Sequence, residues 1–387
     1  MRTRKLLKEE HGITRPLWEE IFTEDDASFL NYYYQWKTAE NEIYVIEDKN
    51  LPVSMLQLNP YMVRSEKGNF LLHYIIAVAT KKEYRKKGYM TELLTTAAKE
   101  MYKRKEPFTF LMPAAEDIYY PHGFRFIYKQ KQCRITLDDL SDFQNTKVKI
   151  RYADISDGRA MADFAEGILG DIYQVRTVRT EGYYHMLMKE QQSEYGGMLL
   201  LEEDENITGM AAVAFDGNRG ELREPLLKNP ERIMQILTWL KEKKASVVST
   251  SAVSDKEEEV LNRYFPDLQW KQVPVIMARA IHLETFLGMF VANRDFTVSI
   301  FIQDTMLLDN TGVWKVTGRK GENLLAEKSE IQDGYSKIRI SDLVTVLFGY
   351  NAQRDREKKV YENLPQEIQI IMESTEPLSK VFLNEIV

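Results

Sequence analysis

The stretch that decides the fold reads Ile76-Ala-Val-Ala-Thr80-Lys-Lys-Glu-Tyr-Arg85-Lys-Lys-Gly88-Tyr-Met90-Thr-Glu-Leu-Leu94. It joins an apolar strand to an amphipathic helix through a basic loop, and the helix begins directly after Gly88. Five of the seven residues from Lys81 to Lys87 are cationic. The free N–H groups of a first helical turn and the helix dipole both favour negative charge, and a glycine lets a phosphate approach the backbone. The stretch therefore predicts a pyrophosphate site, with a solvated basic turn as the structural alternative.

The sequence on either side of this stretch alternates between helix and strand patterns. The run Phe70–Ala79 is almost wholly apolar, which is typical of a central strand covered on both faces. From Tyr89 to Lys105 the apolar residues have the spacing of one helix face. The other elements expected in the first 140 residues are helices at 15–22 and 26–38, a hairpin of strands at 43–46 and 53–58, a buried strand at 108–112, a helical turn at 118–120 and one or two closing strands over 124–137.

The segment from Val148 to Ala280 repeats this order of patterns, which predicts a second copy of the same unit. Its expected elements are strands at 148–152, 198–202, 207–215, 246–250 and 275–281 and helices at 159–168, 181–190, 231–243 and 256–264. From Glu284 onward the pattern changes to a strand-rich third domain. Its expected elements are a short helix near 284, strands at 296–302, 313–317, 324–328 and 337–340, and helices at 341–348 and 365–374.

Length, composition and charge restrict the class of protein. At about 150 residues per domain, the 387 residues predict two or three domains. Hydrophobic residues at 44% and charged residues at 29% are typical of a folded chain. The formal net charge of −7 disfavours nucleic acid and anionic membranes as partners.

The cysteine, histidine and apolar content gives further expectations. Cys133 is the one cysteine, which excludes an internal disulfide and fits a reducing compartment. The five histidines are scattered without metal-ligand spacing, so no protein-built metal site is expected. The sequence has no signal-peptide core and no run of about 18 apolar residues, and we therefore expect a cytoplasmic protein.

Two motifs together resemble the GCN5-related N-acetyltransferases (GNAT). The segment Glu83-Tyr-Arg85-Lys-Lys-Gly88-Tyr-Met90 is similar to the family's Arg/Gln-x-x-Gly-x-Gly/Ala signature, with Met90 at a position that is usually small. Downstream, Ile118-Tyr119-Tyr120-Pro-His-Gly123-Phe124 resembles the family's Tyr-x-x-x-Gly-Phe/Tyr element near the thioester. Across essentially all of its length the chain resembles the Eis (enhanced intracellular survival) class, in which two acetyltransferase-like units precede a domain similar to sterol carrier protein 2.

This resemblance implies an architecture and a chemistry. The fold class is α/β (α+β), with tandem GNAT-like mixed-sheet domains at residues 1–144 and 145–283 and a sterol carrier protein 2-like α+β domain at 284–387. The implied co-substrate is acetyl-CoA, without a metal. The implied partner is a small-molecule or lysine amine acceptor, and the assembly of identical chains is left open. The acceptor itself is open among aminoglycosides, polyamines and protein lysines.

The resemblance also implies site residues. The main chain of Val78, Ala79 and Thr80 would pair with the pantetheine arm of the co-substrate. The residues implied at the pyrophosphate are Arg85, Lys86, Lys87, Gly88, Tyr89, Met90 and Thr91, and those implied beside the channel are Ala114 and Ala115. Tyr119 would be the general acid that protonates the departing CoA thiolate, with Tyr120 as the alternative.

In Eis-like proteins the base is the terminal carboxylate of the chain, which here belongs to Val387. The segment Val381–Val387 stays apolar to its end, which indicates docking rather than a frayed tail. A terminal carboxyl group is a weak base for an ammonium, so it would act through a water molecule or by orienting the amine. Glu116, Asp117 and His122 are the rival bases.

The acceptor pocket is the least specified part of the sequence. Acidic residues at Glu24, Asp25, Asp26 and Glu385 are candidates for binding a polycationic amine. Aromatic residues at Phe29, Tyr32, Tyr33, Tyr34 and Trp36 are candidates for its walls. Ordinary core packing and solvated helix ends explain these residues equally well.

The second unit is not expected to bind CoA. At the position of the basic loop it reads Arg219–Glu231, with no glycine at the helix start and little net positive charge.

The motifs of the first unit and the family resemblance together favour an acetyl-CoA-dependent N-acetyltransferase. The rival function is a carrier of lipid or another apolar ligand with a vestigial acetyltransferase unit.

Overall fold

The computed structural model describes residues 1–65, 68–138, 140, 143, 147–329, 334–350 and 355–385. Its first part contains the expected helices and strands, together with an additional strand at the N-terminus. The elements are β1 (Arg2–Lys5), α1 (Arg15–Ile21), α2 (Ala27–Gln35), β2 (Glu42–Asp48), β3 (Leu51–Ser65), β4 (Gly68–Thr80), α3 (Tyr89–Lys103), β5 (Phe108–Leu111), α4 (Glu116–Tyr119) and β6 (Arg125–Thr136). The closing segment after Gly123 is one long strand.

The second part confirms the repeated order of elements and corrects one segment. Its elements are β7 (Lys149–Tyr152), α5 (Gly158–Leu169), β8 (Val175–Thr177), α6 (Glu181–Ser193), β9 (Gly197–Glu203), β10 (Asn206–Asp216), β11 (Arg219–Leu227), α7 (Ile233–Glu242), β12 (Val247–Ser251), α8 (Asp255–Tyr264) and β13 (Lys271–Ala280). The interpretation of Arg219–Glu231 as the counterpart of the basic loop was wrong, because most of this segment is strand β11. The true counterpart is the short connection from Lys228 to Arg232.

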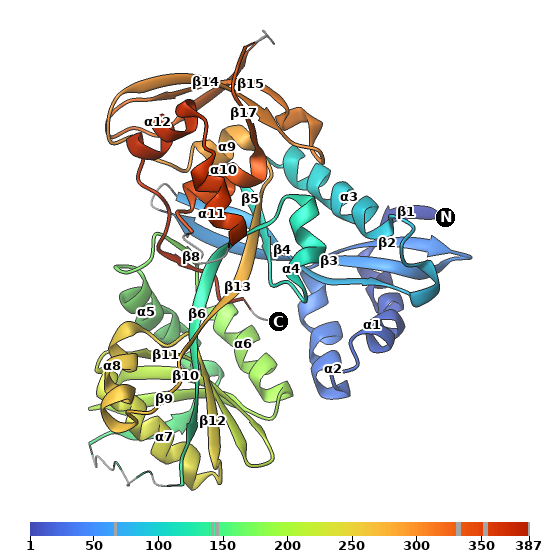
Figure 1. The fold of residues 1–387 in the computed structure, drawn as a ribbon. Coiled ribbons are helices and arrows are strands. Elements are labelled where there is room, and N and C mark those ends of the chain that lie inside the picture. Colours follow the sequence, from blue (N-terminus) through green and yellow to red (C-terminus); the bar gives the residue numbers. More distant parts are fainter. Residues whose placement is uncertain are drawn as a thin grey trace.

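The third part is α+β, as expected. Its elements are α9 (Leu283–Leu287), β14 (Phe296–Gln303), β15 (Gly312–Gly318), β16 (Leu325–Ser329), β17 (Lys337–Arg339), α10 (Ile340–Leu347), α11 (Asp355–Glu362), α12 (Gln366–Ser374) and β18 (Val381–Phe382). Four of these strands form a separate sheet in the order β16-β15-β14-β17. In Figure 1 this part, in orange and red, lies above the second unit and beside the first.

One sheet runs through both of the first two units. Its strand order is β1-β2-β3-β4-β5-β13-β6-β12-β11-β10-β9-β7. The last strand of the second unit, β13, therefore lies between β5 and β6 of the first. Strand β6 pairs with β13 over Arg125–Gln132 and with β12 over Cys133–Thr136, so it belongs to both halves of the sheet (Figure 1). The predicted boundaries at 144/145 and 283/284 stay predictions.

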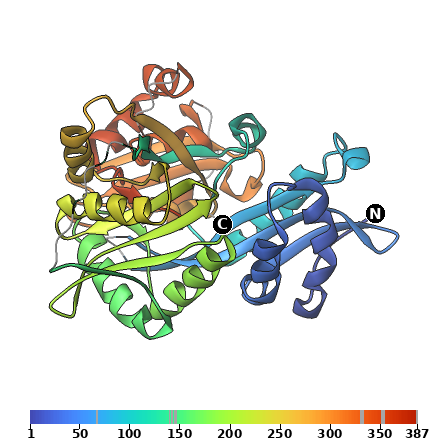
Figure 2. The ribbon, with the colours of Figure 1, turned by 90° about the horizontal axis from the view of Figure 1, so that it is seen from below.

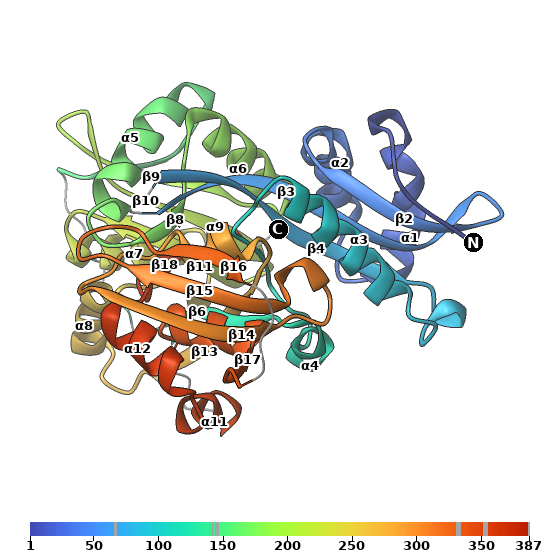
Figure 3. The same ribbon diagram turned by 90° about the horizontal axis from the view of Figure 1, so that it is seen from above.

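Strand β4 is central, as its apolar sequence predicts. On one face, Ala77 and Ala79 pack with residues of α1 and α2 such as Trp18 and Tyr33. On the other face, Ile75 packs in a cluster with the apolar stripe of α3. Figure 3 shows α3 on one side of β2, β3 and β4 and the pair α1 and α2 on the other. Both faces of the strand are covered, which explains its lack of polar alternation.

Local signals in the sequence explain where several helices begin. The Asp26 side chain accepts a hydrogen bond from the Phe29 N–H at 2.9 Å and so caps α2. Thr180 caps α6 in the same way. Helix α6 lies beside α2 (Figures 2 and 3), where the Tyr32 hydroxyl donates to Glu190. Among the described residues, no helix is long and apolar enough to cross a membrane.

Candidate active site

The two central strands of the first unit separate where the basic loop begins. Strands β4 and β5 are parallel and share a single registered pair, Tyr74 with Phe110. Between the registered pairs Gln57–Ile76 and Met55–Ala79, two steps along β3 oppose three along β4, and the extra residue is accommodated at Ala77, whose φ is +51°. This β-bulge bends β4 away from β5. Val78, Ala79 and Thr80 therefore line an opening in the sheet on the β5 side.

The basic loop follows this opening directly. Lys86 and Gly88 both have left-handed backbone conformations, with φ of +62° and +83°. A Cβ atom at Gly88 would meet no atom within 4 Å, so the glycine faces open space at the start of α3. The first turn of α3 has no intrahelical acceptors for its N–H groups. The loop therefore offers free backbone donors at the positive end of a helix of 15 residues.

Four of the five cations of the loop are exposed, whereas Lys81 is half-buried and pairs with Glu20 at 3.7 Å. The Arg85 Nε donates to the Thr80 carbonyl at 3.1 Å, which folds its guanidinium back over the end of β4. The Lys87 ammonium lies 4.8 Å from the centre of the Tyr84 ring. Lys86 is exposed and forms no ion pair with any described residue. The loop thus combines free backbone donors with positive charge, and the anion site there stays a prediction.

Ala114 and Ala115 lie on the other side of the opening, after β5. Both residues are exposed, and Ala115 is the N-cap residue of α4. The alanine side chains at these two positions add little volume beside the ends of β4 and β5.

Tyr119 lies at the end of α4 and is 8% exposed. Its ring contacts Phe124 in an edge-to-face arrangement, with ring centres 5.8 Å apart. Burial raises the pKa of the Tyr119 phenol to about 12. Its hydroxyl has no hydrogen-bond partner among the described residues, so the phenol is a neutral donor without an internal acceptor. Tyr120 is half-buried, and its ring lies against the Arg125 guanidinium at 4.6 Å.

The turn after Tyr119 is held by a residue from the second unit. Gly123 has φ of +85°, which favours glycine, and the Phe124 N–H donates to the Tyr119 carbonyl at 3.3 Å. Arg279 of β13 donates from Nε to the His122 carbonyl at 2.8 Å. A Cβ atom at Gly123 would lie 3.4 Å from that Nε. Gly123 therefore allows Arg279 to approach the turn.

Arg279 also ties the turn to the third part of the chain. Its side chain and that of Asp304 are each 1% exposed and form an ion pair of 2.5 Å. The Asp304 carboxylate also accepts from the backbone of Met306 and Leu307 and from Asn310. Sequence reasoning missed this pair. The available signal was a charged residue inside an otherwise apolar strand, since buried charges occur in proteins mainly as pairs.

The candidate bases differ in burial, and one of them is not described by the structure. Glu116 is half-buried, Asp117 is exposed, and burial lowers the pKa of His122, which keeps that imidazole neutral. Val387 lies outside the described residues. The expected docking of the chain end is confirmed as far as Glu385, since β18 pairs with β8 and Glu385 is 4% exposed.

Three cavities lie between the first unit, α6 and the chain end, and the structure brings some of the predicted acidic residues to them. Glu24, Asp25 and Asp26 line a cavity of about 540 Å³. Asp25 and Phe29 also line a second one of about 370 Å³, and Glu385 lines a third of about 260 Å³. We call these the outer, middle and inner cavities.

The predicted aromatic walls are only partly correct. Phe29 lines the outer and middle cavities. Tyr32 faces α6 through its bond to Glu190 at 3.1 Å. Tyr33 is fully buried in the core, Tyr34 bonds to Thr14, and Trp36 is exposed with Lys189 over its ring. These last three residues line none of the three cavities.

Glu190 of α6 is the residue that sequence reasoning missed here. It lines both the middle and the inner cavity and is 6% exposed. Burial raises the pKa of its carboxyl to about 7. Lys37, also buried, donates to the Tyr61 hydroxyl at 2.8 Å, and its charge opposes that effect of burial on Glu190. Nothing in the local sequence of α6 distinguishes Glu190 from a solvated glutamate.

Glu385 carries an unpaired oxygen. Its Oε2 accepts a hydrogen bond from the Tyr183 hydroxyl at 3.1 Å, whereas its Oε1 is buried without a partner. A buried carboxylate oxygen without a donor is costly unless a ligand or water supplies one.

Tyr74 of β4 is buried between the rings of Tyr61 and Phe110, with ring centres 6.3 and 5.3 Å away. Burial raises its pKa, and smaller contributions come from the charges of Tyr119, Glu385 and Glu190. Tyr74 itself lines none of the three cavities.

Comparisons with known proteins assign the first part of the chain. Residues 2–127 match the model of the acetyltransferase (GNAT) domain family. This segment is a GNAT acetyltransferase domain. The chain that carries it is an N-acetyltransferase. No curated protein matches the sequence.

Solved structures share the whole fold at low identity. A protein from Enterococcus faecalis V583 described as a probable N-acyltransferase has a TM-score of 0.82 at 17% identity, over 100% of this chain and 99% of its own. A GCN5-related N-acetyltransferase from Kribbella flavida has a TM-score of 0.75 at 12% identity, over 100% of both chains. Eis1 from Mycobacterium abscessus has a TM-score of 0.65 at 11% identity, over 95% of both chains.

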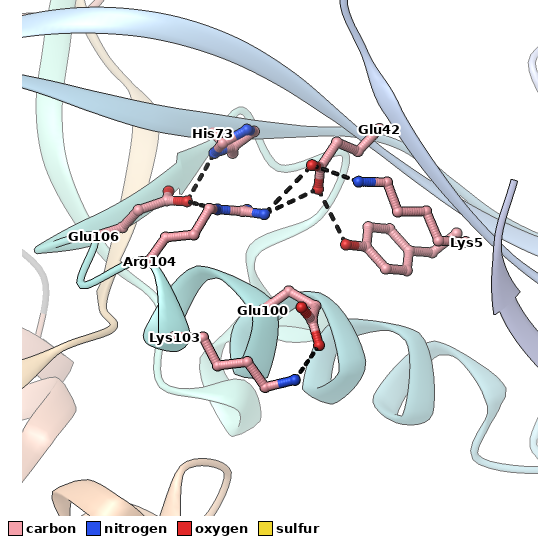
Figure 4. Close-up of polar contacts among 8 residues, drawn as sticks. Lys5, Glu42, His73, Glu100, Lys103, Arg104 and Glu106 are labelled. Atoms are coloured by element: carbon pink, nitrogen blue, oxygen red, sulfur yellow. Dashed lines mark hydrogen bonds and ion pairs between the residues drawn. The ribbon is translucent and has the colours of Figure 1, made fainter. Parts of the chain in front are cut away.

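A polar network braces the GNAT domain at the end of α3 opposite the basic loop, with His73 and Glu106 buried and Arg104 and Lys5 partly exposed (Figure 4). Glu106 accepts hydrogen bonds from His73 Nδ1 at 2.9 Å and from Arg104 Nε at 2.7 Å. Arg104 also contacts Glu42, which binds Lys5 at 2.6 Å. The network joins β1, β2 and β4 to the end of α3 and the start of β5. It thereby fixes the helix whose other end begins at Gly88.

Proposed function

We propose that the protein transfers an acetyl group from acetyl-CoA directly to a primary amine. The observation that carries this proposal is the opening between β4 and β5, which leads directly into a basic loop with free backbone donors. The main chain of Val78, Ala79 and Thr80 would hold the pantetheine arm. The proposed pyrophosphate ligands are Arg85, Lys86, Lys87, Gly88, Tyr89, Met90 and Thr91, and Ala114 and Ala115 would line the channel.

The residues present fit this co-substrate. Lys86 and Gly88 adopt left-handed conformations that turn the loop around the start of α3, and no side chain fills the space at Gly88. Bound acetyl-CoA would supply the activated acetyl group. A local excess of lysines offsets the acidic net charge of the chain at this place.

Tyr119 is the proposed general acid. With its pKa raised to about 12, the phenol stays protonated at neutral pH and can donate to a thiolate whose own pKa is near 8.5. The hydrogen bonds of Arg279 and Phe124 to the preceding turn hold α4 in place. Tyr119 is therefore positioned by the second unit as well as by its own domain.

The carboxylate of Val387 is the proposed base, with Glu116, Asp117 and His122 as rivals. Its support is the docking of the preceding residues. The Gln174 and Val175 N–H groups both donate to the Lys380 carbonyl, and Tyr183 holds Glu385. The low pKa of a terminal carboxyl fits the orientation of an amine better than its direct deprotonation.

A polycationic amine is the proposed class of acceptor. Five carboxylates line the middle cavity: Glu194 and Glu221 pair with Arg223, Glu224 pairs with Arg179, and Asp25 and Glu190 have no ion pair with the described residues. The unpaired Oε1 of Glu385 in the inner cavity would accept a hydrogen bond from an ammonium. A mono-amine would satisfy one of these carboxylates, whereas an aminoglycoside or polyamine would satisfy several.

The domain assignment is proposed with the function. Residues 1–144 would form the catalytic GNAT domain, 145–283 a degenerate second copy, and 284–387 a domain like sterol carrier protein 2. The rival function as a lipid carrier with a vestigial acetyltransferase unit is not favoured, because the GNAT family model matches the first domain and its opening and loop are intact.

The test is an acetyl-transfer assay read by release of the CoA thiol, with an aminoglycoside, spermine, a lysine peptide and a mono-amine as acceptors. We expect turnover with the polycations at lower KM than with the mono-amine. Thiol release at the same rate with every acceptor and with buffer alone would contradict amine transfer.

A further inference from the structure

The second unit contains the same kind of β-bulge that bends the central strand of the first unit. In β11, the three steps from Arg223 to Leu226 oppose two steps of β10, from Ala212 to Met210, and Glu224 has φ of +50°. In β4 the same shift occurs at Ala77, with φ of +51°. Strand β11 pairs with β12 only as far as Arg223 with Ser251, and beyond this pair the two strands separate.

A cavity of about 1100 Å³ fills the space beyond this pair. Its lining includes both separated ends, Pro225–Lys228 and Ala252–Lys256. The remaining walls are β6, the end of α5, and two segments of the third part, which include Ser379–Phe382. We call it the β11–β12 cavity. None of the residues proposed for acetyl-CoA binding or proton transfer lines this cavity, and the inference below does not rest on the proposed function.

The β11–β12 cavity lacks what a nucleotide would need. The connection from Lys228 to Arg232 contains Pro230, which has no N–H group, and Glu231, which is acidic. The Asn229 side chain already accepts the Glu231 N–H at 3.0 Å. No glycine lies at the start of α7. The second unit therefore lacks the counterpart of the pyrophosphate loop, and what remains is the space between the separated ends of β11 and β12.

The deep part is apolar, with aromatic rings. Leu169, Leu226 and Val253 line it and are buried. The Phe382 ring stacks on Tyr173 with centres 4.7 Å apart and forms the wall on the side of the chain end. An apolar chain fits such walls, because it can leave water without losing hydrogen bonds.

The rim of the cavity is cationic. Lys129, Lys228, Lys256 and Lys380 line it, are exposed and form no ion pair with the described residues. Lys131 is neutralised by Asp255 and Glu258. Asp171 is the one other exposed carboxylate in the lining, since Glu257 is buried and bonded to Ser254. Four free lysines against one carboxylate favour an anion, although the whole chain is acidic.

We propose that the β11–β12 cavity binds an apolar monocarboxylate of the fatty-acid type, with its chain between the separated strands and its carboxylate at the lysine rim. A single carboxylate suits side-chain ammonium groups on a rim and needs no cradle of backbone donors. A phosphorylated ligand would need the cradle that the connection before α7 lacks.

The test is calorimetric titration of the full chain with decanoate, with decanol and decylamine as probes of the same chain length. We expect decanoate to bind most tightly, decanol more weakly and decylamine not at all. Equal binding of decanoate and decylamine would overturn the role of the lysine rim, and no binding of decanoate would overturn the proposal.

Two sets of variants locate the site. Gly167 lines the cavity, and a Cβ atom there meets nothing within 4 Å, so Gly167→Trp obstructs the cavity without a backbone clash. We expect decanoate binding to weaken at least about tenfold. Asp163→Trp, one turn earlier on α5 and outside the lining, is the matched control. Equal affinity in the two variants would place the ligand elsewhere and overturn the proposal.

The double variant Lys228→Glu and Lys380→Glu tests the charge. We expect it to weaken decanoate binding by about 3- to 10-fold and leave decanol binding unchanged. Lys315→Glu, an exposed change in β15, is the control for net charge. Loss of affinity in the control equal to that in the double variant would overturn the assignment of these lysines.

Discussion

The proposed role of Tyr119 as general acid depends on a single hydroxyl group. Tyr119→Phe keeps the ring that packs on Phe124 and removes the proton of a phenol whose pKa is about 12. We expect kcat to fall by about 10²–10⁴-fold, while the Kd for CoA stays unchanged, measured by thiol release and by calorimetry. Tyr120→Phe is the matched control. A larger loss in that control would shift the assignment by one residue, and full turnover in both variants would exclude a tyrosine acid.

Glu190 predicts how acceptor binding depends on pH. Its carboxyl, with a pKa of about 7, is neutral below that pH and charged above it. The KM for spermine should therefore fall as pH rises from 6 to 8, because the charged carboxylate attracts the ammonium groups. In Glu190→Gln we expect a higher KM at pH 8 and no such fall. A variant that keeps the wild-type pH profile would show that another group titrates.

At the scale of elements, the loop before α3 makes the pyrophosphate site testable. Gly88→Asp adds a negative charge where no atom lies within 4 Å of a new Cβ. We expect at least about tenfold weaker CoA binding by calorimetry, from charge repulsion at the helix start. Gly217→Asp is the matched control, since Gly217 also has positive φ and open space. Similar CoA affinity in both variants would remove the anion site.

The sequence predicts most elements because their patterns are local. The apolar spacing of α3 and the uniform apolar run of β4 each report the faces that are buried. Strand β11 was missed because Arg219, Glu221 and Arg223 alternate with Gly220, Leu222 and Glu224, which leaves little apolar signal. Its neighbours β10 and β12 specify it instead, and the Arg223 side chain finds partners in Glu194 and Glu221.

Strand β13 of the second unit lies between β5 and β6 of the first, and pairing between such distant segments cannot be predicted from local sequence patterns. The motif residues around Gly88 and Tyr119 could be found because they lie close together in sequence. Glu190 and Arg279 could not, because each reaches the site from the second unit through tertiary packing. An isolated charged residue gives no sign of whether it is solvated or buried until its partner is known.

The Arg279–Asp304 pair predicts that the three parts of the chain unfold together. Arg279→Met leaves Asp304 buried without its cation, and we expect a loss of about 3–5 kcal/mol in the free energy of unfolding, measured with denaturant. The double variant Arg279→Met and Asp304→Leu should recover part of this loss, since no charge is then left unpaired. Equal stability of the single variant and the wild type would show that the pair is not a joint between the parts.

The chain end offers the widest test, because it depends on how all three parts dock. If the Val387 carboxylate orients the amine, an extension moves that charge as effectively as a deletion removes it. A tag of a few residues after Val387 should abolish acetyl transfer, with CoA binding and the melting temperature unchanged, because docking through Lys380 and Glu385 is retained. An N-terminal tag of the same sequence is the control. Full activity in a protein shown by mass to carry the C-terminal tag would return Glu116, Asp117 and His122 as bases.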